Sequence, residues 1–201
     1  MLTEAPGGDG KSSVWQGGWY RPARLVASPN FNQRPPGSAI ELVVIHNISL
    51  PPGVFKGDAV ERLFTNTLDT SAHPFYAQLV GLQVSAHFFV RRSGALYQFV
   101  SCDERAWHAG ASAWRGRSGC NDFSIGIEVE GSDERPFTKR QYVRLAGLLR
   151  QLLHTYPTIA GVAGHSEIAP GRKTDPGPHF DWCRLLAESG LDDIAPALRA
   201  L

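Results

Sequence analysis

The sequence predicts a single α/β domain in which a central mixed β-sheet is flanked by a few helices. Two apolar segments, 40–45 and 124–130, have the β-branched composition of buried strands. A third segment, 138–156, repeats its apolar residues at helical spacing. With 201 residues and 42% hydrophobic side chains, the chain can bury one sizeable core, and no composition shift indicates a second domain. Strands interleaved with helices favour a sheet of mixed strand direction.

The amino-terminal segment is rich in glycine and serine and shows no apolar periodicity. We therefore expect a mobile leader over residues 1–18 and place the folded domain at 19–201. The leader has no basic stretch followed by an apolar one, and no segment elsewhere is long and apolar enough to span a bilayer. These observations predict a cytoplasmic protein with no membrane partner.

The first ordered half of the chain reads as strand, helix and hairpin. Residues 40–45 are too apolar for a half-exposed strand and are predicted to lie at the centre of the sheet, with His46 at the strand's end. Asp58, with a glutamate three positions later, predicts a capped helix through Phe64. Residues 86–92 and 95–100 flank a Ser-Gly pair, which predicts two antiparallel strands joined by a tight turn.

The second half contributes a strand, the longest helix and two short elements. Segment 124–130 alternates strictly, which places Glu128 and Glu130 together on one face. Thr138 and Gln141 form a capping box that opens a helix reaching Tyr156, where a proline stops it. A short strand over 159–163 should deliver His165, and Asp181 should cap a last helix that ends at a glycine. The sequence thus predicts strands and helices throughout 40–190.

Charge and cysteine content narrow the class of partner. Twenty Lys and Arg residues stand against 19 Asp and Glu residues, so the net charge of +1 provides no field to attract nucleic acid. A neutral small molecule or glycan is a better match, and no obligate protein partner is indicated. Cys102, Cys120 and Cys183 are odd in number and widely spaced, as expected for free thiols in a reducing compartment.

One loop, 164–178, carries an imidazole, an ammonium and a carboxylate in a stretch dense in proline and glycine. Because these residues exclude a helix, the loop backbone itself must bring His165 and Asp175 together. His46 can supply a third ligand from the end of its strand. Two imidazoles and one carboxylate suit Zn2+, and three protein ligands leave one position for water, as in catalytic sites. We therefore predict one zinc ion per chain.

Hydrolysis at such a site needs a base for the water and a positive group for the oxyanion. Glu128 and Lys173 are the candidates for these two tasks. Taken alone, Glu128 would ordinarily be a solvated or salt-bridged strand residue, Lys173 a surface charge and Asp175 a loop cap. Glu130, on the same face as Glu128, is the competing candidate for the base.

Several segments of the chain, agreeing in order, resemble the zinc-dependent N-acetylmuramoyl-L-alanine amidases. They are HNISLPPG at 46–53, VSAH at 84–87, RAWHAG at 105–110, CNDFSIGIE at 120–128 and the loop 164–178. The resemblance spans nearly the whole chain, from about Trp19 to about Trp182, and is greatest to the cytosolic members that act on 1,6-anhydromuropeptides. It implies an α/β amidase fold like that of peptidoglycan-recognition proteins. It also implies cleavage of the amide between the lactyl group of anhydro-muramic acid and L-alanine, in cell-wall recycling.

The same resemblance implies roles for individual residues. His46, His165 and Asp175 would bind zinc, and Glu128 and Lys173 would form the catalytic pair. Four further residues are expected to contact the muropeptide: Asn47, Trp107, His108 and Arg117. In the family, basic residues often stand just before the VSAH and CNDF motifs and would contact the carboxylates of the stem peptide. This chain has Gln83 and Gly119 there, so Arg117, two positions before Gly119, is expected to substitute.

The substrate contacts have structural alternatives. Asn47 can bind the glycan or cap its loop, and Trp107 can stack on a sugar or fill the core. His87 and His108, which neighbour aromatic residues, are interpreted as packed groups or cleft walls and not as zinc ligands.

Three other function classes stay open from the sequence. A secreted amidase acting on intact peptidoglycan would use the same chemistry but needs an export signal. A binding module without metal would need a missing ligand, and all three positions are filled. A purely structural zinc would need a fourth ligand, for which Cys183 is the nearest candidate.

Overall fold

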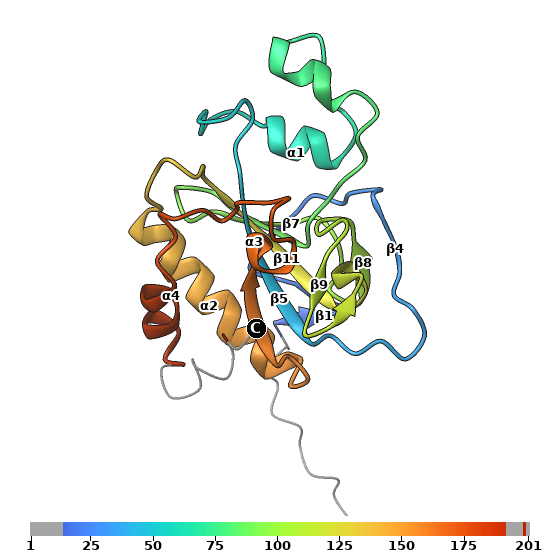
Figure 1. Cartoon of the computed structure of the whole chain (residues 1–201), viewed down its shortest axis with the longest axis vertical. Helices are drawn as coiled ribbons and strands as arrows, with labels where there is room; N and C mark the ends of the chain where they lie inside the picture. Colours follow the sequence, from blue (N-terminus) through green and yellow to red (C-terminus); the bar gives the residue numbers. More distant parts are fainter. Residues whose placement is uncertain (1–13, 192–198, 200–201) are drawn as a thin grey trace, which may run out of the picture.

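The central element of the fold is a six-stranded mixed sheet (Figure 1). The computed structural model describes residues 14–191 and 199. The sheet contains four mutually parallel strands, followed by a fifth that runs antiparallel to the fourth and parallel to the sixth. In spatial order the strands are β12 (Gly161–Gly164), β5 (Leu42–Ile48), β11 (Ser124–Glu130), β6 (Phe88–Val90), β7 (Leu96–Gln98) and β3 (Arg24–Leu25). The predicted α/β class with a mixed central sheet is confirmed.

Strand alternation divides the sheet into two faces with different tasks. Val43 and Ile45 of β5 pack in the large core beneath the helices, together with the odd-numbered apolar residues of β11. Leu42 and Val44 point to the opposite face and join a second cluster with Trp114. His46, two positions after Val44, therefore belongs to the face away from the main helices. This face carries the candidate site.

Helices α2 (Lys139–Thr155) and α4 (Trp182–Ser189) lie side by side against the first face (Figure 1). The capping box predicted at Thr138 is present, because the Thr138 hydroxyl accepts from the Gln141 N–H and the Gln141 side chain accepts from the Thr138 N–H. Asp181 caps α4 as predicted, and Gly190 ends it in the left-handed conformation with φ 62°. Both predicted helices are confirmed.

The hairpin predicted around the Ser-Gly pair is also confirmed. Strands β6 and β7 pair antiparallel, with Phe89 opposite Tyr97. Gly94 in the turn has φ 84°, a value that glycine adopts without the steric cost that other residues bear.

The predicted helix after Asp58 is present as α1 (Ala59–Phe64), but its predicted cap is wrong. The Asp58 side chain makes no capping bond and instead accepts from Arg62 at 2.8 Å. Glu61, the expected partner in the box, accepts from Arg91. Each carboxylate therefore forms an ion pair with an arginine and does not bond to the backbone at the helix end. With the 3-10 helix η1 (Pro74–Leu79), α1 forms a small extension beside the sheet (Figure 1).

Part of the predicted leader belongs to the folded domain. Residues 1–13 lie outside the described residues, so the leader stays a prediction there. The described part forms β1 (Trp15–Gln16), which pairs with β2 (Trp19–Tyr20). The Trp15 ring packs edge-on against Tyr156 at the end of α2, with ring centroids 6.0 Å apart.

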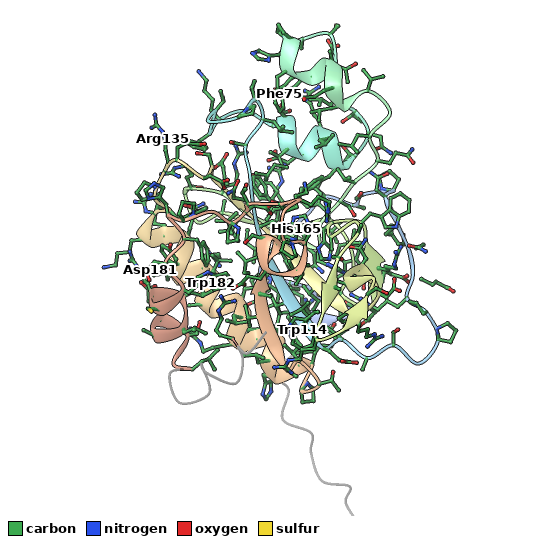
Figure 2. All side chains as sticks on the ribbon, in the orientation of Figure 1. Phe75, Trp114, Arg135, His165, Asp181 and Trp182 are labelled. Atoms are coloured by element: carbon green, nitrogen blue, oxygen red, sulfur yellow. The ribbon has the colours of Figure 1, made fainter. Side chains whose placement is uncertain are left out.

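Besides the β1–β2 pair and η1, two further short strand pairs and a 3-10 turn were not predicted. They are β4 (Phe31–Gln33) with β8 (Glu104–Ala106), β9 (Ala113–Trp114) with β10 (Arg117–Ser118), and η2 (Cys120–Asp122). In Figure 2, Trp114 marks the position of β9, and Asp181 and Trp182 mark the start of α4.

The loop 164–178 begins with a helical turn, contrary to the prediction. Residues His165–Ile168 form α3, whose Glu167 side chain accepts from the Gly164 N–H. The prolines and glycines that excluded a helix all come after this turn, so they end it without preventing it. Among the residues that the structure describes, no helix has both the length and the apolar character needed to cross a membrane.

Candidate metal centre

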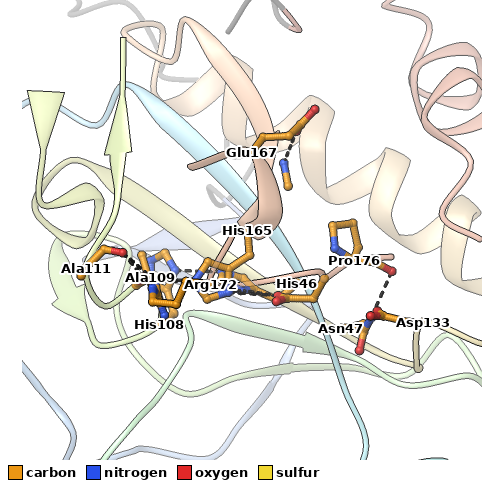
Figure 3. Close-up of polar contacts among 12 residues, drawn as sticks. His46, Asn47, His108, Ala109, Ala111, Asp133, His165, Glu167, Arg172 and Pro176 are labelled. Atoms are coloured by element: carbon orange, nitrogen blue, oxygen red, sulfur yellow. Dashed lines mark hydrogen bonds and ion pairs between the residues drawn. The ribbon is translucent and has the colours of Figure 1, made fainter. Parts of the chain in front are cut away.

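Three donor atoms from distant parts of the chain meet at the carboxyl end of the parallel strands. His46 Nδ1 lies 3.0 Å from His165 Nδ1, and both nitrogens lie 3.1 Å from Asp175 Oδ2 (Figure 3). Both imidazoles are almost fully buried, with exposed fractions of 1% and 3%. The convergence follows from the register, because Gly164 of β12 is level with Ile45 of β5 and each histidine comes next in its chain.

The protonation of this cluster fits a bound cation. His165 Nε2 lies 3.1 Å from the Ala109 carbonyl oxygen, which can only accept, and 3.3 Å from Arg172 Nη2, which can only donate. With the proton on Nε2, directed at the carbonyl oxygen, Nδ1 presents a lone pair to Asp175. An ionised Asp175 likewise presents only lone pairs. Two acceptors 3.1 Å apart repel unless a positive charge lies between them. The donor set therefore fits a divalent metal ion bound by two imidazoles and one carboxylate.

The ionisation of the cluster favours metal binding at neutral pH. Burial lowers the pKa of His46 to about 4, although the nearby Asp175 carboxylate opposes the shift. Burial alone would raise the pKa of Asp175, but the imidazoles of His165 and His46, each 3.1 Å from its Oδ2, outweigh burial and hold that pKa below its ordinary value. Near pH 7 the site thus presents a neutral imidazole and an ionised carboxylate, the forms that bind metal.

Glu128 lies beside the cluster on the neighbouring strand. It pairs in register with His46 on parallel β11 and β5, so both side chains lie on the same face of the sheet. Its Oε2 is buried and has no hydrogen-bond partner within the described part of the chain. Burial, followed by the negative charge of Asp175, raises the pKa of Glu128 well above its ordinary value. Such a carboxylate can accept a proton at neutral pH.

The competing candidate, Glu130, is occupied elsewhere. Its carboxylate is 5% exposed, accepts from Arg91 at 3.2 Å and from the Arg92 N–H at 2.8 Å, and so joins β11 to the hairpin. Lys173 is exposed on the loop of Asp175, where its positive charge partly opposes the rise in the pKa of Glu128 and adds to the fall in the pKa of His46. Of the two glutamates, Glu128 is therefore the one beside the three converging donor atoms that has an oxygen without a partner among the described residues.

The residues predicted to contact substrate are distributed differently. Asn47 uses both amide hydrogens within the protein, donating to Asp133 Oδ1 at 2.7 Å and to the Pro176 carbonyl at 3.0 Å (Figure 3). It thereby fixes the loop directly after Asp175. Of the two alternatives for Asn47, this contact supports the structural one.

Trp107 and Arg117 also have structural partners. The indole N–H of Trp107 donates to Asn32 at 2.8 Å, and its ring is partly exposed, so it does not simply fill the core. Arg117 pairs with Glu41 at 2.9 Å and stacks on Phe123. Glu41 precedes β5, roughly 16 Å of extended strand from His46. The structure does not bring Arg117 close to the donor atoms of His46, His165 and Asp175.

His108 lies behind His46 in the structure. Its Nδ1 is 3.0 Å from His46 Nε2, on the side of the ring away from the metal cluster (Figure 3). Cys183, the candidate fourth ligand, is exposed on α4, and the potential metal ligands that cluster within the described residues are His46, His165 and Asp175.

Three residues that hold segments around the site in place were not predicted from the sequence: Asn121, Asp133 and Arg172. Arg172 donates to the Ala109 carbonyl at 2.6 Å across 63 residues of sequence. The loop motif names Arg172, but no pattern in the sequence indicates its distant partner.

His87, behind His108, provides a test of the neutral histidine layer. Burial and then the nearby Arg34 lower the pKa of His87 from 6.5 to about 3. Between these values the unfolded chain binds one proton more than the folded chain, so stability is lost as the pH falls below 6.5. Between pH 3 and pH 6.5, we expect His87→Gln to reduce the slope of the free energy of unfolding against pH by about 1.4 kcal/mol per pH unit in the metal-free protein. Urea denaturation from pH 7 to pH 4 measures it, with exposed His154→Gln as the control. An unchanged slope would contradict the buried, neutral His87.

Comparison with known proteins identifies the family of this chain. The sequence pattern of the N-acetylmuramoyl-L-alanine amidase family matches residues 36–178. The 1,6-anhydro-N-acetylmuramyl-L-alanine amidase AmpD of Escherichia coli (strain K12) is 54% identical over 169 residues, which cover 84% of this chain and 92% of that protein.

Solved structures show the same relationship. The crystal structure of a selenomethionine AmpD derivative has a TM-score of 0.85 and 50% identity, covering 88% of this chain and 99% of that one. The amidase AmiD from E. coli, in complex with the substrate anhydro-N-acetylmuramic acid-L-Ala-D-gamma-Glu-L-Lys, has a TM-score of 0.54 and 29% identity over 78% of this chain and 60% of that one. On the sequence match, the close relatives and the shared fold, this chain belongs to the N-acetylmuramoyl-L-alanine amidase family.

Proposed function

We propose that this protein hydrolyses the amide bond between the lactyl group of 1,6-anhydro-N-acetylmuramic acid and the L-alanine of muropeptides, with one zinc ion as cofactor, in cell-wall recycling. The observation that carries the proposal is the convergence of His46, His165 and Asp175 beside Glu128, whose buried Oε2 has no hydrogen-bond partner among the described residues. The AmpD relatives, which are named for this activity, support the substrate class.

The residues of the chain divide the reaction between them. His46, His165 and Asp175 would hold the zinc ion, which would supply Lewis acidity and activate water when bound. Glu128 accepts a proton from the attacking water at a carboxylate oxygen and passes it to the leaving nitrogen of L-alanine. The Lys173 ammonium provides positive charge to the oxygen of the scissile carbonyl as negative charge develops there.

We further propose that the enzyme acts in the cytoplasm. Its three cysteines are free: Cys102 and Cys120 are buried, and Cys183 is exposed on α4. Unpaired thiols of this kind suit a reducing compartment.

The decisive experiment compares soluble fragments with intact wall. The purified chain, with its zinc content measured, is incubated with anhydromuropeptide and separately with intact sacculi, and the products are identified by mass. We expect release of free stem peptide from the anhydromuropeptide. Cleavage of sacculi alone would favour the secreted, wall-degrading alternative. A zinc-loaded protein that cleaves neither substrate would refute the proposal.

A further inference from the structure

Two consecutive residues hold the outer nitrogens of both imidazoles at the metal centre. His46 Nε2 lies 3.0 Å from His108 Nδ1, and His165 Nε2 lies 3.1 Å from the carbonyl oxygen of Ala109 (Figure 3). The inner Nδ1 atoms of His46 and His165 meet at Asp175. The segment His108–Ala109 therefore contacts both imidazoles at the nitrogen that faces away from Asp175.

The segment is itself firmly placed. The backbone N–H groups of His108 and Ala109 both donate to Asn121 Oδ1, at 3.1 and 2.8 Å. Asn121 is buried, and Arg172 donates to the Ala109 carbonyl from the loop of Asp175. A displacement of this segment would disturb both histidines together.

The ring of His108 is held by the strand behind it. Its Nε2 lies 3.2 Å from Ser124 Oγ. The ring covers Gly126, where a Cβ atom would lie 2.4 Å from His108 Cγ, too close for any other residue without movement. The rings of His46 and His108 are nearly perpendicular, at 85°, with their centroids 5.1 Å apart.

We propose that His108 is a positioning residue that accepts the Nε2 proton of His46 and thereby keeps the His46 Nδ1 lone pair directed at the metal. A neutral imidazole has one N–H, so a proton on His46 Nε2 leaves Nδ1 free for coordination. His108 can accept at Nδ1 only if its own proton is on Nε2, where Ser124 Oγ is in position to accept it. The opposite direction of donation would place the His46 proton on Nδ1 and block the ligand.

This role replaces the substrate contact predicted for His108. Outer partners of metal-binding histidines fix the ring and its tautomer, and their loss weakens metal binding by about 10- to 100-fold. A substrate contact would instead affect KM with zinc affinity unchanged. The inference rests on the proposed function only in taking zinc as the metal.

Two substitutions of matched size test the role. Asparagine and leucine are nearly isosteric, but asparagine retains an acceptor near the position of Nδ1. Zinc affinity, measured by competition with a chromophoric chelator, should fall about 10- to 100-fold in His108→Leu and by less than about 10-fold in His108→Asn. Equal losses in both variants, or no loss in His108→Leu, would overturn the proposal.

A second measurement does not depend on how these variants fold. Long-range 15N–1H spectra of zinc-loaded wild type should show His108 protonated at Nε2 and unprotonated at Nδ1. A protonated Nδ1 would overturn the proposal. Ser124→Ala should weaken zinc binding less than His108→Leu, and Ser189→Ala, a buried serine on α4, should leave it unchanged. Tight zinc binding without hydrolysis in wild type would refute the proposed function alone.

Discussion

Replacing Glu128 with glutamine should lower the rate of amide hydrolysis by about 10²- to 10⁴-fold while zinc remains bound. Glutamine preserves the shape of the side chain but cannot accept the proton of the attacking water. Glu128 is not among the three residues whose donor atoms converge, so the metal should stay. Steady-state rates on anhydromuropeptide, with zinc measured by elemental analysis on the same samples, would give both quantities.

Glu130→Gln is the matched control on the same strand and face. Because Glu130 pairs with Arg91 and the Arg92 backbone, its loss should reduce the free energy of unfolding and leave the rate of folded enzyme nearly intact. A zinc-loaded and fully active Glu128→Gln protein, or a Glu130→Gln protein with the greater loss of rate, would show that the base is assigned wrongly.

Asp175→Asn should remove zinc and activity together. The carboxylate is the only anionic member of the converging donor set, and its charge compensates that of the metal. Losing a hydrogen-bond partner of a metal ligand typically weakens metal binding by about 10- to 100-fold. Replacing Asp175 itself should weaken zinc binding by more than this. Competition titration of zinc, followed by activity at saturating metal, separates weak binding from slow chemistry.

Chelation and pH provide the checks on this second prediction. Exhaustive removal of metal should abolish hydrolysis in wild type, and added zinc should restore it. Metal affinity should decrease with falling pH, because protons compete for the ligands, and His46 contributes to this decrease as the pH approaches its pKa of about 4. Activity that survives chelation, or full zinc retention by Asp175→Asn, would exclude the assigned site.

Prediction from sequence was most successful where structure is decided locally. The capping box at Thr138 and the turn glycine Gly94 act within a few residues of sequence, so their patterns are visible in the chain itself. Strand pairs of two or three residues, such as β4 with β8, are too short to show alternation. Asp58 failed as a cap because a competing cation, Arg62, lies within reach.

The sequence by itself determined the chemistry of the site: it supplied two imidazoles, the carboxylates of Asp175 and Glu128, and a family resemblance that the comparisons confirm. The tertiary structure decided which of these groups meet. Glu128 lies beside His46 only because β11 and β5 are parallel neighbours in register. His108 contacts His46, and Arg117 lies near the start of β5, at the opposite end from His46. Residue type sets what a side chain can bind, whereas its partner depends on contacts across many residues of chain.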